Sequence, residues 1–492
     1  MNLSLDLKQP AIRQSINLFG IVLAVAIAAY FVTNDWLGAA GVIVLWAGWQ
    51  FLPTIGGPPI LQLAFTHQWM QIFLGLYYHG LTGRKLEAIE LSDYRPMVMI
   101  GMGCLIALLI GLTVGKEVAR RIFKIEHQQM DEAFSLRWLV IGYAASFLVV
   151  GGITALAWQI PSLAQAILAL SFLRLALLFL LLRKLVWPQI QAHWIALILI
   201  AEVTIGITGF FAGFREPLVI ATVVLLERFE VRNFRHWAVF GGLAVAALFL
   251  AVLWTAAKID YRSKFVSDAA FANSTETRLS YITNTLGNLA AGEGGEIAEQ
   301  TDALVDRMWA VYYPALAVAR VPAEESHTDG EILRSALLHI VTPRFFFPEK
   351  ENLPSDSAMV RKYSGIWVAG SDPDVEEENY TSIAFGYAAE SYVDFGLPWM
   401  FAPVLIWGLL MGFIYQLFFK LIAHRELAIA VAAVIFWISL YLFERSWAKT
   451  LGQSATFFFY LTAVTFVVDR FLLSHKSAGT LSGHRSLATG RV

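Results

Sequence analysis

Two carboxylates lie close together in the stretch FGYAAESYVDFG, residues 385–396, where Glu390 and Asp394 are four residues apart. If this stretch is helical, Tyr387, Glu390, Ser391 and Asp394 share one polar face, on which like charges repel mildly. Repulsion and partial burial raise the pKa of a carboxyl group, which suits a general base. A face of acid, hydroxyl and phenol groups at a cavity would suit sugar hydroxyls and proton transfer. The alternative is an interfacial helix whose acids face water.

Two arginines could supply positive charge to such chemistry. In GFFAGFREPL, Arg215 follows glycines and precedes Pro217, a pattern that indicates a tight bend. Anchoring of this arginine at the membrane interface is the equal alternative. Arg344 lies among prolines and three phenylalanines in TPRFFFPEK, a segment too rich in proline for a helix. Its guanidinium could pair in fork geometry with phosphate or ring hydroxyls, or simply lie beside a membrane-dipping Phe patch.

Other kinds of chemistry lack their motifs. The sequence has no G-x-x-x-x-G-K-[ST] and no H-E-x-x-H, and its histidines are scattered without ligand-like company, His67 among them. Asp372 and Asp374 in SDPDVEEE fit a solvated loop better than a cation site. We therefore expect no metal and no cofactor. The single cysteine, Cys104, lies in an apolar run and excludes an intramolecular disulfide.

The elements that must position these residues are membrane helices. The chain of 492 residues is 57% hydrophobic and only 15% charged, with a mean hydropathy of +0.60. The excess of apolar residues is arranged in blocks, as bilayer-spanning segments require. This pattern predicts an all-α polytopic membrane protein with about twelve transmembrane helices. The predicted spans are 16–33, 37–55, 61–81, 97–115, 138–158, 162–182, 193–213, 217–226, 237–257, 398–419, 426–443 and 454–474.

The connections between spans predict the topology. With a cytoplasmic N-terminus, the basic connections KEVARRIFK, RKLVWPQ, ERFEVRNFRH and KLIAHRE all fall on one side, as the positive-inside rule expects. Four regions follow: an N-terminal bundle (1–257), a large, mainly helical extracytoplasmic loop (258–397), C-terminal transmembrane helices (398–474) and a cytoplasmic tail (475–492). A loop of this length is usually functional.

Several charges lie within or beside the predicted spans. Arg174 and Glu202 are deep in two spans and should face the bundle interior or each other, as an ion pair or as the lining of a polar cavity. Glu444 and Arg445, in LYLFERSWAKTLG, lie at an outer membrane edge and could add to the same polar pocket.

Three short stretches, in order, resemble the bacterial oligosaccharide repeat-unit polymerases of the O-antigen polymerase (Wzy) type. GFREPL matches a Gly-x-Arg element, TPRFFFPEK a Pro-Arg-…-Pro-x-Lys element, and AESYVDFG an acid-Tyr-…-Phe-Gly element. The chain departs from the family at FGLPWM, where Phe-Gly-x-x-Gly is common. The related O-antigen ligases tend to carry a histidine in the stretch that here reads ENYTSIAFGYAAE, and its absence favours a polymerase.

The resemblance implies a metal-independent glycosyltransferase at the outer face of the bacterial inner membrane, with the large loop periplasmic. It would transfer a glycan from a polyprenyl-diphosphate-linked donor to a second lipid-linked unit. Membrane lipids and a chain-length-regulating membrane protein are the expected partners, and nucleic acid is not. The expected catalytic residues are Glu390 (base), Asp394 (second choice as base), Arg344 and Arg215. The expected substrate-binding residues are Tyr387, Tyr392, Lys350, Arg361 and Arg278.

Three other functions stay open. The chain could be a transporter or flippase for a lipid-linked glycan, which would use Arg174 and Glu202. It could be a ligase-like transferase, or a non-catalytic partner that organises a polysaccharide assembly complex through its large loop.

Overall fold

The protein is described by a computed structural model. The structure describes residues 8–52, 57–123, 134–160, 163–187, 189–208, 214–230, 233–265, 275–291, 297–344, 346–347, 349–367 and 383–486. Within these ranges the regular elements are all helices, and no β-strand occurs. The predicted all-α class is therefore confirmed.

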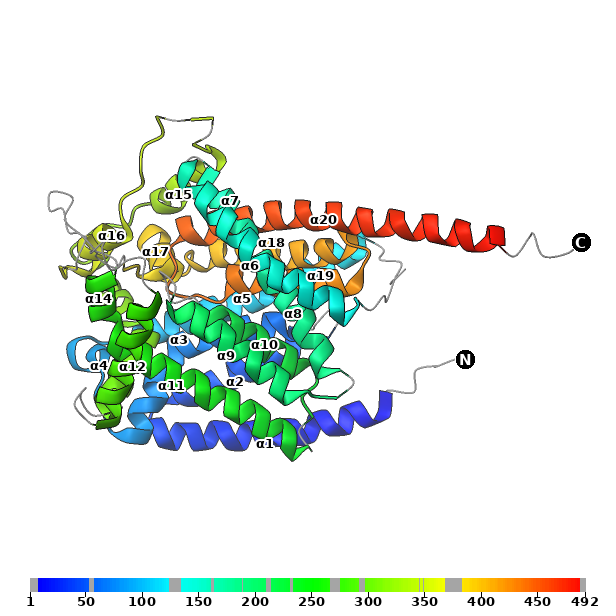
Figure 1. Ribbon diagram of the computed structural model, residues 1–492. Coiled ribbons are helices and arrows are strands. Elements are labelled where there is room, and N and C mark those ends of the chain that lie inside the picture. Colours follow the sequence, from blue (N-terminus) through cyan, green and yellow to red (C-terminus); the bar gives the residue numbers. More distant parts are fainter. Residues whose placement is uncertain are drawn as a thin grey trace, which may run out of the picture.

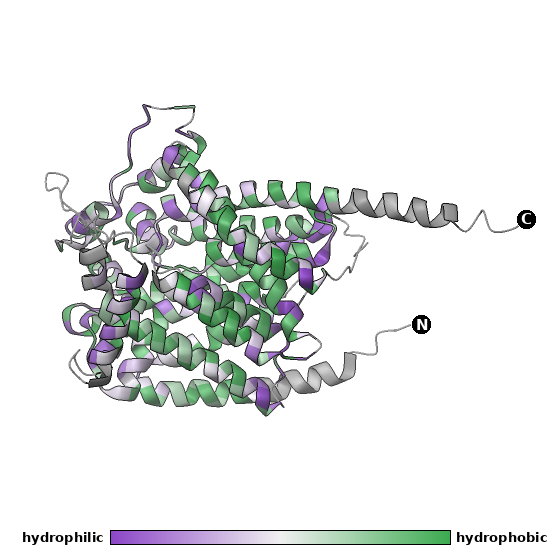
Figure 2. Ribbon diagram, viewed as in Figure 1, coloured by the Kyte–Doolittle hydropathy of each residue, from purple (hydrophilic) through white to green (hydrophobic). Residues whose placement is uncertain are grey.

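Long apolar helices form the body of the molecule (Figure 1). Among the described residues, six segments are long and apolar enough to cross a membrane: Arg95–Ile122, Leu136–Thr154, Ala164–Val186, Phe234–Ala257, Phe401–Leu421 and Trp447–Phe471. Three shorter apolar helices are Phe19–Thr33, Trp36–Phe51 and Ala192–Gly206. Apolar residues follow the long helices, whereas hydrophilic residues gather toward both ends of the bundle (Figure 2).

The helices of the bundle lie where the sequence places the apolar segments. They are α1 (Lys8–Thr33), α2 (Trp36–Phe51), α3 (Ile60–Thr82), α5 (Arg95–Ile122), α6 (Leu136–Gln159), α7 (Ala164–Ser171), α8 (Leu173–Val186), α9 (Ala192–Thr208), α10 (Arg215–Glu227), α11 (Phe234–Phe265), α18 (Phe401–Leu421), α19 (Arg425–Leu440) and α20 (Trp447–Ser486). Each of the twelve predicted segments overlaps one or two of these helices. The number of true spans and their orientation stay predictions, because only six segments have the length and composition of a span.

Short helices fill the rest of the described chain. They are α4 (Glu87–Leu91), α12 (Thr275–Ala291), α13 (Ile297–Met308), α14 (Tyr312–Arg320), α15 (Glu331–Val341), α16 (Asp356–Ser364) and α17 (Gly386–Phe395). Figure 1 shows α4, α12, α14, α16 and α17 together at one end of the long helices. The described part of residues 258–397 is therefore largely helical and packs on the bundle, whereas its being one extracytoplasmic loop stays a prediction.

Helix α18, which follows α17, is held tightly against α5. A Cβ atom added to Gly412 would lie 2.1 Å from the backbone oxygen of Leu112, so only glycine permits this approach. Small residues at such contacts let two membrane helices pack backbone to backbone. Close packing of α18 on α5 fixes the position of α17 at the end of the bundle.

Candidate functional site

Helix α17 carries the polar face that the sequence predicts, and that face is buried. The helix begins at Gly386, whose φ of 87° suits glycine, and it ends before Gly396. A Cβ atom at Gly386 would lie 2.5 Å from the backbone oxygen of Phe443. Tyr387, Glu390, Ser391 and Asp394 are all buried. The helix is as predicted, but its polar face packs against protein and is neither a cavity wall nor a water-exposed surface.

Glu390 lies against the start of α20. Its Oε2 accepts a hydrogen bond of 2.6 Å from the backbone amide of Trp447, and the residue is 4% exposed. Burial raises the pKa of Glu390 to about 8, and the charges of Asp356 and Asp394 add to the rise. The Trp447 hydrogen bond and Lys449 oppose this shift. The raised pKa has the direction that the acidic pair in the sequence indicates, although desolvation outweighs repulsion as its cause.

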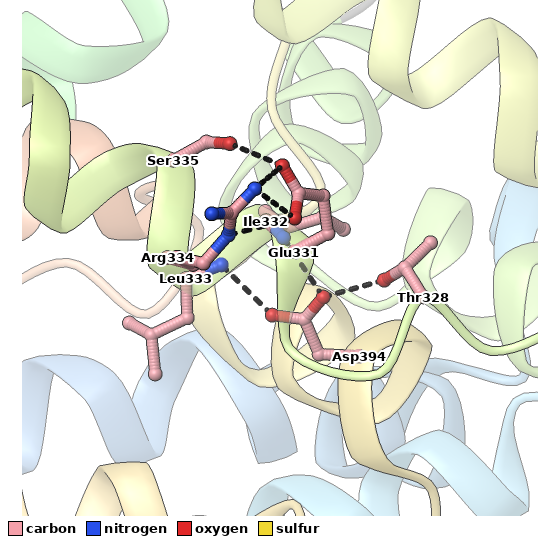
Figure 3. A network of polar contacts seen from close by, with 7 residues as sticks. All are labelled: Thr328, Glu331, Ile332, Leu333, Arg334, Ser335 and Asp394. Carbon is pink, nitrogen blue, oxygen red and sulfur yellow. Dashed lines mark hydrogen bonds and ion pairs between the residues drawn. The ribbon is translucent and has the colours of Figure 1, made fainter.

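Asp394 holds another helix in place (Figure 3). Its carboxylate accepts backbone hydrogen bonds of 3.0 and 2.9 Å from Ile332 and Leu333 in the first turn of α15, and a third bond from the Thr328 hydroxyl. A carboxylate at this position satisfies amides that a helix cannot pair internally. Burial raises the pKa of Asp394, and these three hydrogen bonds counteract it. With both oxygens occupied, Asp394 has the contacts of a structural residue, and we do not propose it as a base.

The two tyrosines of α17 also point into the protein. The Tyr387 hydroxyl donates to Oε1 of Gln68 in α3 across 2.6 Å, and the ring packs against Phe443. The Tyr392 hydroxyl donates to the backbone oxygen of Val321 at 3.1 Å. Neither phenol lines an open sugar-binding surface, so substrate binding by Tyr387 or Tyr392 stays a prediction.

Two arginines converge on one aromatic ring in the connection between α19 and α20. Arg215 donates from Nη2 to the Tyr441 hydroxyl at 2.7 Å, and its guanidinium carbon lies 4.9 Å from the ring centroid. The guanidinium carbon of Arg445 lies 5.2 Å from the same centroid. Arg215 also pairs with Glu216 at 3.0 Å, and Arg445 donates to the Ile438 backbone oxygen at 2.7 Å. The Arg215 side chain is 51% exposed, so the cluster reaches the surface.

His67 belongs to this cluster, which the sequence did not indicate. Its Nδ1 lies 2.8 Å from the Tyr441 backbone oxygen, and its ring centroid lies 5.3 Å from that of Tyr441. The charge of Glu444 acts on both Arg215 and Arg445. We call His67, Arg215, Tyr441, Glu444 and Arg445 the arginine cluster.

The arginine cluster is tied to α17 through the α19–α20 connection, residues 441–446. The backbone oxygen of Arg445 accepts a 2.8 Å hydrogen bond from the amide of Tyr387. Two residues later, Trp447 donates from its backbone amide to Glu390 and from its indole to Ser391 at 2.8 Å. One short segment therefore contacts Arg215 at its start and Glu390 at its end.

Arg344 lies apart from these groups. It is exposed and donates to Oδ1 of Asn352, while Lys350 donates to the His339 backbone oxygen. Burial and the charge of Arg344 lower the pKa of Lys350. Arg344 follows the C-terminal end of α15, whereas Asp394 binds the first turn, and a helix of this length spans about 16 Å. Among the described residues no contact joins Arg344 to Glu390 or Arg215, so these side chains do not touch, and their convergence on one substrate stays a prediction.

The other two candidate substrate-binding arginines are also separate. Arg361 is exposed on α16. Arg278 is buried on α12, where it forms a hydrogen bond with the Tyr261 phenol of α11. These contacts give Arg278 a place in the packing of α11 on α12, and its role in substrate binding stays a prediction.

An apolar groove of about 520 Å³ opens beside α17 and the start of α20. Its walls come from α15, α18 and α20 and from the end of α17. The lining consists of Leu333, Leu337, Phe395, Trp399, Ala402, Pro403, Ile406, Trp407, Leu410, Trp447 and Leu451. The only lining residue that also binds Glu390 is Trp447. Trp447 therefore lies between this groove and the buried carboxyl group of Glu390.

The intramembrane charges pair as the sequence predicts. Arg174 forms an ion pair with Glu202, and the same carboxylate accepts a hydrogen bond from Tyr143. The guanidinium carbon also lies 4.9 Å from the ring centroid of Phe147. Of the two alternatives, Arg174 and Glu202 therefore form a structural ion pair and do not line an open polar cavity.

A family model described as a domain of unknown function, DUF8712, matches residues 98–471. The chain belongs to this family. The DUF8712 region contains Arg215, Arg344, Glu390 and Arg445, whereas His67 lies before it. No curated protein matches the chain, and no solved structure does either.

Proposed function

We propose that this protein is a membrane glycosyltransferase that joins polyprenyl-diphosphate-linked oligosaccharide units. In this proposal the arginine cluster binds the donor diphosphate, the apolar groove receives the polyprenyl chain, and Glu390 serves as the base. The resemblance of GFREPL, TPRFFFPEK and AESYVDFG to repeat-unit polymerases supports the reaction class. The bacterial inner membrane, with residues 258–397 in the periplasm, is the corresponding location.

The observation that carries the proposal is the approach of Arg215 and Arg445 to one ring, that of Tyr441. Like charges brought together in a partly desolvated place repel, and an anion between them would offset that repulsion. A diphosphate offers the oxygens that planar guanidinium groups bind in fork geometry. The exposed side of Arg215 leaves the cluster accessible to such a ligand.

The reaction would proceed as follows. The hydroxyl oxygen of the acceptor sugar forms a bond to the anomeric carbon of the donor, and the bond from that carbon to the diphosphate oxygen breaks. The hydroxyl proton passes to the Glu390 carboxylate, and polyprenyl diphosphate leaves with the bonding electron pair. Arg215 and Arg445 stabilise the negative charge that develops on the leaving group.

Access to Glu390 sets a condition on this reaction. The carboxyl group is 4% exposed, and only its Oε2 takes a hydrogen bond among the described residues. The acceptor hydroxyl must therefore approach Oε1, which requires the α19–α20 connection to move.

Arg344 and Lys350 would act as secondary basic groups where the exposed Phe346 and Phe347 meet the membrane surface.

The decisive experiment uses the purified full-length protein with a lipid-linked oligosaccharide and measures polymer length on gels. The proposal expects polymer from the wild-type protein alone. It also expects that Arg215→Ala and Arg445→Ala lose polymer while their membrane insertion stays normal. The matched control is Arg334→Ala, because Arg334 is also a partly exposed arginine in an ion pair, here with Glu331. Unchanged polymer length in both cluster variants would refute the assignment of the site.

A further inference from the structure

A second polar hollow lies where α8 ends and α19 begins. It has a volume of about 310 Å³ and is lined by Leu180, Arg183, Lys184, Trp187 and Glu426. All of its lining residues except Leu180 lie in RKLVWPQ and KLIAHRE, two connections that the positive-inside rule places on the same side of the membrane. The Arg183–Glu227 and Arg183–Glu426 contacts bring α8, α10 and α19 together there.

The charges around this hollow differ in how well they are paired. Arg183 donates two hydrogen bonds to Glu227, of 3.0 Å from Nε and 2.7 Å from Nη2. Lys184 Nζ and Arg183 Nη1 each lie 3.9 Å from Glu426 Oε1, which is ion-pair distance but beyond hydrogen-bond distance. Glu426 Oε2 is buried and has no hydrogen-bond partner among the described residues. Among the described residues the hollow therefore contains one ammonium group that makes no hydrogen bond and one carboxylate oxygen, Oε2 of Glu426, that accepts none.

An aromatic wall completes the site at the surface. The Trp187 side chain is about half exposed, and the Arg228 guanidinium carbon lies 5.0 Å from its ring centroid. Arg228 is held there by a hydrogen bond to the Val186 backbone oxygen. Tryptophan rings of this kind concentrate at the headgroup level of membranes, where one part of the ring is wet and the other apolar.

We propose that this hollow binds the phosphoethanolamine headgroup of a membrane phospholipid. The lipid phosphate would pair with Lys184, and the lipid ammonium would donate hydrogen bonds to Glu426. A purely anionic headgroup would bring a second negative charge beside Glu426 and leave its Oε2 without a donor, which is costly in a partly buried place. A choline headgroup has no N–H to donate. Glu426 lies in the first turn of α19, where the helix dipole stabilises its negative charge. This site lies at the start of α19, whereas Tyr441 of the arginine cluster follows the end of that helix. The test of the site does not depend on the proposed function.

The test measures the unfolding temperature of the purified full-length protein in detergent by intrinsic tryptophan fluorescence. The added ligands are phosphatidylethanolamine, phosphatidylcholine, phosphatidylglycerol or soluble phosphoethanolamine, each over a range of concentrations. We expect phosphatidylethanolamine to raise the unfolding temperature at lower concentration than the other three. Lys184→Gln and Glu426→Gln should each weaken this effect about tenfold, because each removes a charge-assisted hydrogen bond. Lys420→Gln is the matched control, since Lys420 stacks on Phe123 outside the hollow.

Each contrary result overturns the proposal. Stronger stabilisation by phosphatidylglycerol would identify an anionic-lipid site, and equal stabilisation by all lipids would identify unspecific solvation. Stabilisation by soluble phosphoethanolamine at the same concentration would show a site for a free phosphate ester. Retention of the full effect in both variants would show that phosphatidylethanolamine binds elsewhere. If a variant folds poorly, the wild-type protein still tests the proposal, because the order in which the four ligands raise its unfolding temperature does not depend on any variant.

Discussion

Arg215 donates a hydrogen bond of 2.7 Å to the hydroxyl of Tyr441, a residue 226 positions further along the chain. The contact joins the start of α10 to the connection that follows α19. Because Arg445 approaches the same ring, the two arginines form one unit, and a variant of either should affect the other.

Arg215→Lys should lower the rate of polymer formation about 100-fold, a loss typical of removing one donor to a developing negative charge. Lysine keeps the charge but loses the planar fork and the stacking on Tyr441. Arg344→Ala should lower the rate less than tenfold, because Arg344 is separate from the arginine cluster. Initial rates with one lipid-linked donor provide the comparison. A larger loss in Arg344→Ala than in Arg215→Lys would reverse the assignment.

The rate should rise with pH up to about 8. A general base must be deprotonated to accept a proton, and burial raises the pKa of Glu390 to about 8. Glu390→Gln should abolish the rise and most of the activity. Rates measured from pH 6 to 9 in the wild-type protein and this variant check the prediction. Glu444→Gln is the informative comparison: if it alone removes the rise, Glu444 is the base.

Glu390 should also make the stability of the protein depend on pH. Its pKa in the folded state, about 8, is above the ordinary value of 4.5, so the folded state holds this proton more tightly than the unfolded state. The resulting stabilisation is complete below pH 4.5 and is lost as pH rises to about 8. The unfolding temperature of Glu390→Gln should therefore decline less over this window. A parallel decline in both proteins would show that Glu390 titrates normally.

Asp394→Ala should destabilise the protein by about 1–3 kcal/mol, because two backbone amides of α15 lose their acceptor. Asp394→Asn keeps one acceptor oxygen and should cost less. Both variants should retain polymer formation at low temperature. Thermal unfolding and an activity assay on the same preparations separate the roles. If Asp394→Asn unfolds normally but makes no polymer, Asp394 is catalytic.

Filling the apolar groove should weaken the binding of lipid-linked donor. Leu451→Trp places a large side chain in the groove and should raise KM for the donor with a smaller effect on kcat. Val467→Trp, on an exposed position of the same helix, is the matched control. Saturation curves with donors of different polyprenyl length measure the effect. An unchanged KM at every length would exclude the groove as the site of the hydrocarbon chain.

Much of the fold could be predicted because its causes are local. Apolar runs predict the bundle helices, and the segment 61–81, which contains His67, Gln68 and Gln71, forms α3 as well. The pairing of Arg174 with Glu202 follows from the cost of an isolated charge among apolar helices. The helix at 386–395 follows from its polar periodicity, with glycine at both ends.

The candidate site was less predictable because it depends on contacts between distant segments. His67 meets Tyr441 across 374 positions, and no spacing in the sequence indicates that neighbour. The sequence also could not show that the polar face of α17 is covered by the start of α20. The motif resemblance and the residue types predict Arg344 beside Glu390, whereas the length of α15 separates Arg344 from Asp394, the carboxylate that binds the other end of that helix.

The α19–α20 connection links the arginine cluster to the buried Glu390, because Tyr441 at its start contacts Arg215 and Trp447 after its end contacts Glu390. If an anion bound to Arg215 displaced Tyr441, the hydrogen bond from the Trp447 amide to Glu390 would be weakened, because only five residues separate Tyr441 from Trp447. In the proposed reaction, binding of the donor at the arginine cluster and exposure of Glu390 would thereby be coupled: the carboxyl group would become accessible when a donor is bound and stay buried when the site is empty.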